Sequence, residues 1–202
     1  QIGKIYEKAV QRVIERTKFK SLIRESLRDA AVDGDSLMYF YFDPDEPSGQ
    51  DWAEGDIKAE LVMNTNVIFG NPYAHDIQDQ PYIILVRRRP VRQAREEARM
   101  RGIPDWEQIV SESEDSYVGE DKQQDETLCT ELVRFWKERG EDGKKHVWMQ
   151  RVTGSIVTER AKDTGLTRYP AAWWSWTPRR NCYHGVSPLT EVIPTQIAVN
   201  QL

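Results

Sequence analysis

The chain lacks most of the features that mark membrane, secreted, metal-binding and nucleotide-binding proteins. Its 202 residues contain no run of about 18 apolar residues, so we predict no membrane span and no membrane partner. The two cysteines, Cys129 and Cys182, form neither a disulfide framework nor a C-x-x-C zinc pattern, and the three histidines are scattered. No glycine-rich phosphate loop and no signal-peptide pattern occur. We therefore expect a reduced intracellular origin, no enzymatic activity, no metal and no cofactor.

The chain is also poor in apolar residues and uneven in charge. Hydrophobic residues make up 39% of it and charged residues 30%, which predicts thin cores and much surface facing solvent or partners. Residues 87–101 hold seven arginines against Glu96 and Glu97, whereas residues 112–126 hold seven carboxylates against Lys122. Such an asymmetry indicates nucleic-acid contact, pairing between subunits, or simply two solvated faces.

The first ninety residues alternate between helical and extended patterns. Apolar spacing predicts helices over 2–16 and 19–31, the second ended by Gly34. Strands are predicted over 37–42, 57–63 and 82–88, with a short apolar patch at 67–69 and a polar loop over 43–56. We therefore expect helices combined with a small mixed sheet.

A helix beginning at Pro90 and covering 91–101 has few large apolar residues. It is therefore not expected to be a core helix, and should pack weakly or against copies of itself. Residues 111–127 have the composition of a flexible acidic segment. Strands over 128–137, 145–151 and 155–158 then predict a small β-rich unit of about 60 residues between two helices.

The end of the chain combines an aromatic strand with another helical pattern. Trp173, Trp174 and Trp176 could stack on nucleic-acid bases, although core or interface anchors are the favoured interpretation. Ser187 and Pro188 predict a helix start, with Pro194 expected to kink that helix or delay it. Because no C-cap signal precedes Leu202, we expect the chain to continue in a larger subunit. The helix has the apolar residues Leu189, Val192, Ile193, Ile197 and Leu202.

Taken in order, several passages resemble the portal protein of tailed bacteriophages and prophages. The resemblance rests on the helix–Gly–strand passage at 30–42, on 64–77, and on the strand and basic helix at 82–101. It continues with the strand Leu132 to Lys137 and with Tyr169-Pro170, Trp176 and the Tyr183-x-Gly185-x-Ser187 turn, ending at Asn200. The motifs are degenerate and together cover most of the chain. No single motif is diagnostic, so the resemblance rests on their order.

The resemblance implies an α+β subunit truncated before the crown. Residues 1–89 would belong to the wing, 90–102 to the first stem helix, 103–184 to the clip and 185–202 to the start of the second stem helix. The implied role is structural: a homo-oligomeric ring, of twelve subunits in this family, at the capsid vertex of the virion, assembled in the host cytoplasm. Its implied partners are double-stranded DNA passing through, the terminase motor, the head–tail connector or adaptor, and the capsid protein.

Within that interpretation, two groups of residues are candidate sites. Arg92, Arg95 and Arg99 are candidates for contact with channel DNA or with a neighbouring subunit, while Trp173, Trp174, Trp176 and Tyr183 would anchor the clip to the stem. Two alternatives stay open. The chain could be another kind of nucleic-acid-binding module that uses the block from Arg87 to Arg101, or a fragment of an enzyme whose active site lies elsewhere.

Overall fold

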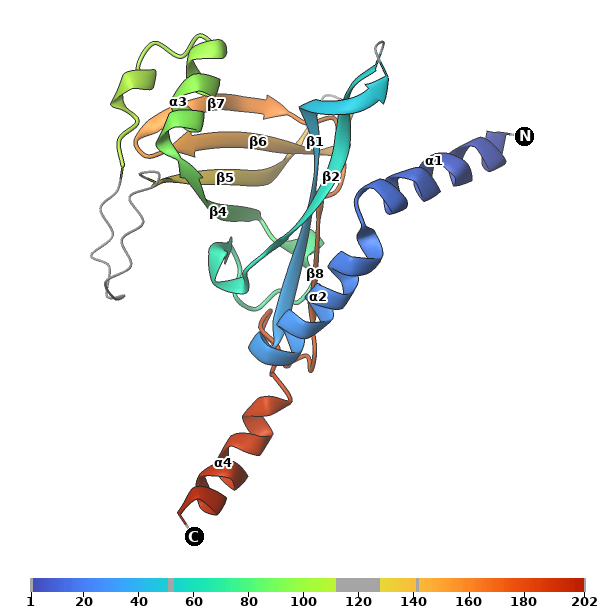
Figure 1. Cartoon of the computed structure of the whole chain (residues 1–202), viewed down its shortest axis with the longest axis vertical. Coiled ribbons are helices and arrows are strands. Elements are labelled where there is room, and N and C mark those ends of the chain that lie inside the picture. Colours follow the sequence, from blue (N-terminus) through green and yellow to red (C-terminus); the bar gives the residue numbers. More distant parts are fainter. Residues whose placement is uncertain (1, 51–52, 112–127, 141, 202) are drawn as a thin grey trace. The chain divides into compact units, whose positions relative to one another are not determined.

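The computed structural model describes residues 2–50, 53–111, 128–140 and 142–201, and its fold is α+β as predicted. The described residues form four α-helices and two small antiparallel sheets, of three and five strands, neither closed into a barrel (Figure 1). The predicted mixed sheet is wrong, because every strand pairing is antiparallel.

The chain divides into two compact units that interleave along the sequence. Unit 1 consists of Gln1–Thr65, Asn71–Gln80 and Tyr169–Leu202, and unit 2 of Asn66–Gly70 and Pro81–Arg168. The regions assigned by resemblance to 1–89, 90–102, 103–184 and 185–202 stay predictions, because they are defined by position in a ring rather than by contacts within one chain.

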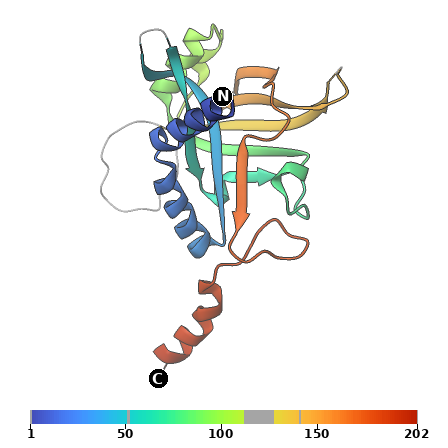
Figure 2. The same ribbon diagram turned by 90° about the vertical axis from the view of Figure 1, so that its right-hand side faces the viewer.

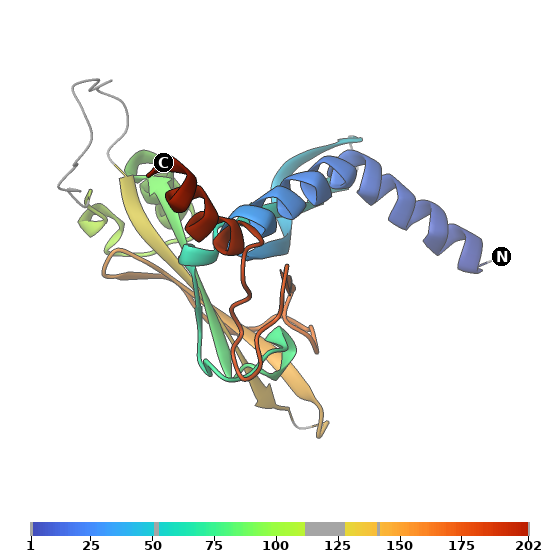
Figure 3. The same ribbon diagram turned by 90° about the horizontal axis from the view of Figure 1, so that it is seen from below.

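Unit 1 begins with two consecutive helices, α1 (Ile2–Arg16) and α2 (Phe19–Asp33), as the apolar spacing predicts. The helices meet at a bend, seen in Figure 3, where Lys18 adopts a left-handed conformation with φ of 50°. α2 ends at Gly34, whose φ of 91° suits glycine and whose N–H donates to the carbonyl of Ala30. The predicted end of this helix is confirmed.

The sheet of unit 1 has the order β2-β1-β8, with α2 lying along β1 (Figure 2). The strands are β1 (Asp35–Gln50), β2 (Ala53–Val62) and β8 (Ala171–Ser175). The polar loop predicted over 43–56 is wrong, because β1 continues to Gln50 and β2 begins at Ala53. Backbone pairing needs no apolar side chains, and register shifts between Asp43 and Gln50 accommodate the irregular stretch.

Side-chain hydrogen bonds hold the segment 71–80 to the residue where the chain returns to unit 1. The Tyr169 hydroxyl donates to the carbonyl of Gln80 at 2.9 Å, and the Tyr169 N–H donates to Gln78 Oε1 at 2.9 Å. Burial raises the pKa of Tyr169 to about 12, so the phenol keeps its proton and remains a donor. This contact fixes the start of the path that leads through Pro170 into β8.

Unit 2 is built on a five-stranded meander in which each strand pairs with the next along the chain. The order is β3-β4-β5-β6-β7. The strands are β3 (Val67–Phe69), β4 (Tyr82–Pro90), β5 (Leu128–Arg139), β6 (Lys145–Thr153) and β7 (Ile156–Asp163). Ile83, Leu85, Val133 and Phe135 share one face and are almost completely buried. The predicted β unit after residue 127 is therefore larger than expected, because β3 and β4 complete its sheet. The acidic segment predicted over 111–127 lies, apart from Ser111, outside the described residues.

The helix α3 (Val91–Met100) follows β4 directly, one residue later than the start predicted at Pro90. Its residues Val91, Ala94 and Ala98 recur on one side and are buried in a cluster with Ile109 and Cys129 of unit 2. The prediction that this helix is not a core helix is wrong. Small alanine side chains let the helix approach the sheet closely, so its buried face needs no large residues.

The helix α4 (Leu189–Asn200) ends the described chain and projects from the sheet of unit 1 in Figures 1 and 2. Ser187 Oγ accepts from the Leu189 N–H at 3.1 Å, and Pro188 has helical φ and ψ of −60° and −24°, as predicted for an N-cap at Ser187 and a first helical residue at Pro188. The helix begins before Pro194 and continues through it, contrary to the predicted delayed start, while the predicted kink stays a prediction. Every residue from 189 to 200 is exposed.

Candidate functional site

The arginine block separates into two populations in unit 2. Arg87 and Arg89 lie opposite Glu131 and Cys129 in the β4–β5 register, on the buried side of the sheet. Glu131 is 1% exposed, and Arg89 Nη1 reaches its Oε1 at 3.1 Å, while Arg87 Nη1 lies 3.7 Å from its Oε2. These arginines are neutralised inside the sheet and are therefore poor candidates for binding an external ligand.

Arg89 also links this buried carboxylate to α3. Its guanidinium donates to Glu97 through both Nη atoms, one of them at 2.9 Å. The hydrogen bond with Glu97 raises the pKa of Arg89. Burial by itself would raise the pKa of Glu97, but its hydrogen bonds with Arg89 outweigh burial and lower that pKa. The pair holds α3 against β4 with both groups charged.

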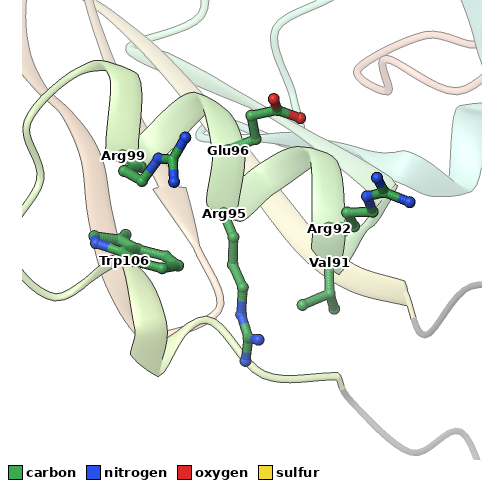
Figure 4. A pocket seen from close by; sticks show the side chains of 6 residues that line it. All are labelled: Val91, Arg92, Arg95, Glu96, Arg99 and Trp106. Carbon is green, nitrogen blue, oxygen red and sulfur yellow. The ribbon is translucent and has the colours of Figure 1, made fainter.

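Arg92, Arg95 and Arg99 form the second population. They lie on the side of α3 that faces away from Glu97. Among the described residues no carboxylate forms an ion pair with any of them, and their one described bond runs from Arg95 Nε to the carbonyl of Ile109 at 2.8 Å. They border a hollow with a volume of about 410 Å³. Figure 4 shows the lining side chains on α3 and the following turn: Val91, Arg92, Arg95, Glu96, Arg99 and Trp106. We call this hollow the arginine groove.

The arginine groove carries three cations and one carboxylate, together with apolar surface from an indole and a valine. Guanidinium groups suit phosphate and carboxylate ligands because their planar forks can donate two parallel hydrogen bonds. The groove can therefore hold an anion, and a flat anion in particular. Of the predicted site residues, this structure brings Arg92, Arg95 and Arg99 together on one helix.

The predicted tryptophans lie in unit 1, around the start of β1. Trp174 Nε1 donates to Ser26 Oγ of α2 at 2.8 Å, and Trp173 Nε1 donates to the carbonyl of Tyr183 at 3.0 Å. The Trp173 and Tyr183 rings meet edge to face, with centroids 6.1 Å apart. Trp176 is 44% exposed and joins this region through its backbone N–H, which donates to the carbonyl of Gly34. Two of the three tryptophans therefore fasten β8 to its surroundings, and the third faces outward.

Asp35 is the centre of this region, although the sequence patterns did not single it out. The carboxylate is 2% exposed and accepts from Ser175 Oγ, from the Gly185 N–H and from His184 Nδ1, each at 2.7 Å. Its position directly after the glycine that ends α2 was the available signal, because an aspartate entering an aromatic strand needs donors. We call Asp35 with these three partners the Asp35 joint.

Two glycines permit the close backbone approach at the Asp35 joint. A Cβ on Gly185 would lie 2.5 Å from the Ser175 Cβ and 2.9 Å from the Gly34 carbonyl oxygen. A Cβ on Gly34 would lie 3.1 Å from the Ser187 nitrogen. Ser187 Oγ in turn donates to the carbonyl of Ala31 at 2.6 Å. The end of α2, the start of β1 and the entry to α4 are thus tied at one place.

The Asp35 joint contains serine, histidine and aspartate, but not in the order of a nucleophilic triad. Ser175 Oγ donates to Asp35 and not to the histidine, so His184 is not placed to take the serine proton. The Asp35 carboxylate is buried and accepts hydrogen bonds from three donors. These bonds hold the start of β1 against β8 and the segment that follows it.

A second histidine, His146, bridges two loops of unit 2. Its Nδ1 lies 2.8 Å from Asp163 Oδ2 and its Nε2 lies 3.1 Å from Asp142 Oδ2. The hydrogen bonds with Asp142 and then Asp163 raise the pKa of His146. Both carboxylates have a lowered pKa, chiefly through the backbone N–H of Lys144 for Asp142 and of Gly165 for Asp163. Both ring nitrogens can donate only in the imidazolium form, so this clasp depends on pH.

Within the described part of the chain, no group of three or more His, Cys, Asp or Glu residues is arranged to hold a metal ion. Cys129 is buried and Cys182 half-buried, and the structure shows no disulfide bond between them. None of the helices described for this chain has the length and apolar character needed to cross a membrane. Comparison with known proteins yields no matching family model and no matching curated protein. The functional argument therefore rests on the residues and on their geometry.

Proposed function

We propose that this chain is part of a portal subunit of a tailed bacteriophage or prophage, which forms a ring channel at the capsid vertex for DNA packaging and ejection. In that role it docks the terminase motor and the head–tail connector, and it acts structurally rather than as an enzyme. The proposal rests on the resemblance of passages that follow one another along the chain. It also rests on one structural observation, the exposure of the apolar side chains of α4.

The surface of α4 is the observation that carries the proposal. Its large aliphatic side chains are all at least half exposed: Leu189 50%, Val192 56%, Ile193 54%, Ile197 52% and Val199 59%. They lie on several sides of a helix whose single charged residue is Glu191. A helix that is apolar on most sides is normally buried, so α4 needs partners that the described residues do not supply. Neighbouring copies in a ring would supply them.

The Asp35 joint supports the same proposal, because it connects two of the passages that carry the resemblance. Gly34 and Asp35 belong to the helix–Gly–strand passage, whereas His184, Gly185 and Ser187 belong to the passage that leads into the last helix. A fixed exit from the sheet gives α4 a defined direction. Subunits of a closed ring need such a direction, because every copy must present the same surfaces.

The test is the oligomeric state of the purified chain, measured by native mass spectrometry and negative-stain imaging. We expect a closed ring of about twelve subunits, and we expect Ile193→Asp to reduce it to monomers by placing a charge in the covered surface. Thr195→Asp is the matched control, since it adds the same charge on a different side of the same helix.

The proposal fails if the wild-type chain is monomeric at high concentration, or if both aspartate variants assemble as the wild type does. A thermal unfolding curve should be the same for both variants. Because residues 193 and 195 are exposed in the single chain, loss of the ring would then not reflect loss of the fold.

A second candidate function is a nucleic-acid-binding module of another kind. The arginines of the arginine groove favour it, because none of them has an ion-pair partner among the described residues. A monomeric chain that binds DNA with a strong salt dependence would support that function in place of a ring. The DNA contact and the ring are compatible, and in a portal the arginine groove could face either the DNA or a neighbouring subunit.

A further inference from the structure

The arginine groove combines positive charge with an aromatic side chain. Its cations are Arg92, Arg95 and Arg99, none of which has an ion-pair partner among the described residues, in contrast to Arg87 and Arg89. The same hollow is lined by the indole of Trp106. Unpaired guanidinium groups beside an indole would suit a ligand that carries both phosphates and a flat ring.

The geometry of α3 sets the length of such a ligand. Arg92 and Arg99 are seven residues apart, which corresponds to about 10.5 Å along the helix axis. Arg95 lies between them in sequence and is half-buried, with its Nε held by the Ile109 carbonyl. The buried positions Val91, Ala94 and Ala98 fix the helix on its sheet, so the arginine stems project from a firm base. The groove therefore suits a short stretch of a phosphate chain rather than a single ion.

The position of Trp106 decides between single-stranded and double-stranded nucleic acid. The indole is half-buried in the hollow and also packs against the cluster beneath α3. In a duplex the faces of the bases are covered by their neighbours, so a recessed indole cannot stack on them. An unpaired base can leave the chain and stack on an aromatic ring while its phosphates contact arginines.

We infer that the arginine groove binds a short single-stranded segment of nucleic acid, with its phosphates on Arg92, Arg95 and Arg99 and one base on Trp106. The inference rests on the proposed function, because it assigns the ligand of the same arginine face. It goes further in requiring an unpaired strand, such as a single-stranded overhang at the end of a DNA duplex. An acidic peptide would pair with the arginines but would leave the indole without a stacking partner.

The experiment compares fluorescence anisotropy of a labelled 12-nucleotide oligothymidine with that of a labelled 12-base-pair hairpin duplex, using the full chain. We expect the single strand to bind at least several-fold more tightly. With about three phosphates contacted, log K should fall with log salt with a slope of about −2. Arg92→Gln and Arg99→Gln should each make that slope shallower by about 0.7.

Variants of Trp106 separate stacking from charge. Trp106→Leu should weaken single-strand binding roughly tenfold and leave duplex binding unchanged, whereas Trp106→Tyr should retain most of the affinity. Thermal unfolding of both variants shows whether the cluster beneath α3 is intact. Arg160→Gln is the matched charge control, since Arg160 is an exposed arginine on β7, outside the groove lining.

Equal affinity for strand and duplex, an unchanged affinity in a folded Trp106→Leu variant, or the same loss with Arg160→Gln would each overturn the inference. Native mass spectrometry of the same samples separates this result from the proposed function. A ring that does not bind the single strand contradicts only the groove assignment. A monomer that binds it through Trp106 supports the groove and contradicts the ring.

Discussion

The helices α3 and α4 are both short, of ten and twelve residues, but differ in apolar content and in burial. From its composition α3 was expected not to be a core helix, and that expectation was wrong. α3 has few large apolar residues but buries Val91, Ala94 and Ala98 in its own unit. α4 is rich in large aliphatic residues and buries none of them in the described chain. Apolar content therefore indicates how much surface a helix must cover, whereas residue size and spacing decide whether its own unit can cover it.

The difference between the two helices also separates two kinds of stabilisation. α3 is held by close packing and by the Arg89–Glu97 pair, both completed inside unit 2. α4 is attached to unit 1 mainly through the residues that precede it, at the Asp35 joint. Changes under α3 should therefore alter the stability of the chain, and changes on α4 should alter its assembly.

The largest effect on stability is expected for Glu131→Gln. The substitution removes the buried carboxylate that Arg87, Arg89 and Arg151 share, and leaves Arg89 with Glu97 and Arg151 with Glu159 as their remaining ion pairs. We expect the free energy of unfolding to fall by about 3–5 kcal/mol, as for other buried pairs that lose one partner. Urea unfolding followed by tryptophan fluorescence measures the change.

The contact between Glu131 and Arg151 shows which force the substitution removes. Arg151 Nε lies 3.8 Å from Glu131 Oε1, and both Arg151 Nε and Glu131 Oε2 are buried without a hydrogen-bond partner. The attraction at these atoms is thus Coulombic, so Glu131→Gln should destabilise although it keeps the shape. Glu191→Gln on α4 changes the same charge at an exposed site and should leave the unfolding free energy within about 0.5 kcal/mol of wild type. Similar losses in both variants would contradict this account of the cluster.

An intermediate effect is expected when one alanine on each helix is enlarged. Ala98 of α3 is 1% exposed, so Ala98→Leu should overpack the cluster and lower the unfolding free energy by about 1–3 kcal/mol. Ala198 of α4 is exposed, and Ala198→Leu should change stability by no more than about 0.5 kcal/mol. Thermal and urea unfolding of the two variants, measured side by side, test the contrast directly. A tolerated leucine at Ala98 would mean that α3 is loosely packed, as its composition first suggested.

The smallest effect concerns His146, whose clasp is complete within unit 2. Because the pKa of His146 is raised in the folded state, its contribution is fully present below the unfolded pKa and is lost as pH rises through the folded pKa. The pKa values of Asp142 and Asp163 are lowered, so their contribution is present above their unfolded pKa and is lost as pH falls through the folded values. The clasp is therefore closed from mildly acidic pH up to the raised pKa of the histidine.

Titration of the His146 ring protons by NMR should give a pKa above the ordinary value of about 6.5, and Asp163→Asn should lower it. The same titration in Ile193→Asp should be unchanged, because the clasp does not depend on α4. A shift in that variant would show that the loops of unit 2 sense assembly, which would weaken the separation drawn between the two helices.

Single-chain patterns predicted the elements well where local physics decides them. Apolar spacing predicted α1 and α2, the positive φ at Gly34 follows from its place after the helix, and alternation predicted most strands. The prediction failed over 43–56, because strand pairing there depends on the partner backbone and not on side-chain polarity. The site residues were found in part. The arginines of β4 and α3 were visible as one block, but the sequence did not show that Arg87 and Arg89 pair with Glu131 while the arginines of α3 line the arginine groove.

The sequence by itself determined the α+β class, the end of α2 at Gly34 and the charge asymmetry, because each depends on a residue type and its near neighbours. Only the tertiary structure decided which groups meet. It placed Asp35 against Ser175, His184 and Gly185, some 140 to 150 positions away in the chain. It also directed Arg87 and Arg89 to Glu131 and left Arg92, Arg95 and Arg99 beside Trp106. The physical reason is that sheet register and the helix face on the sheet set these distances, and both arise from pairings between segments far apart in the chain.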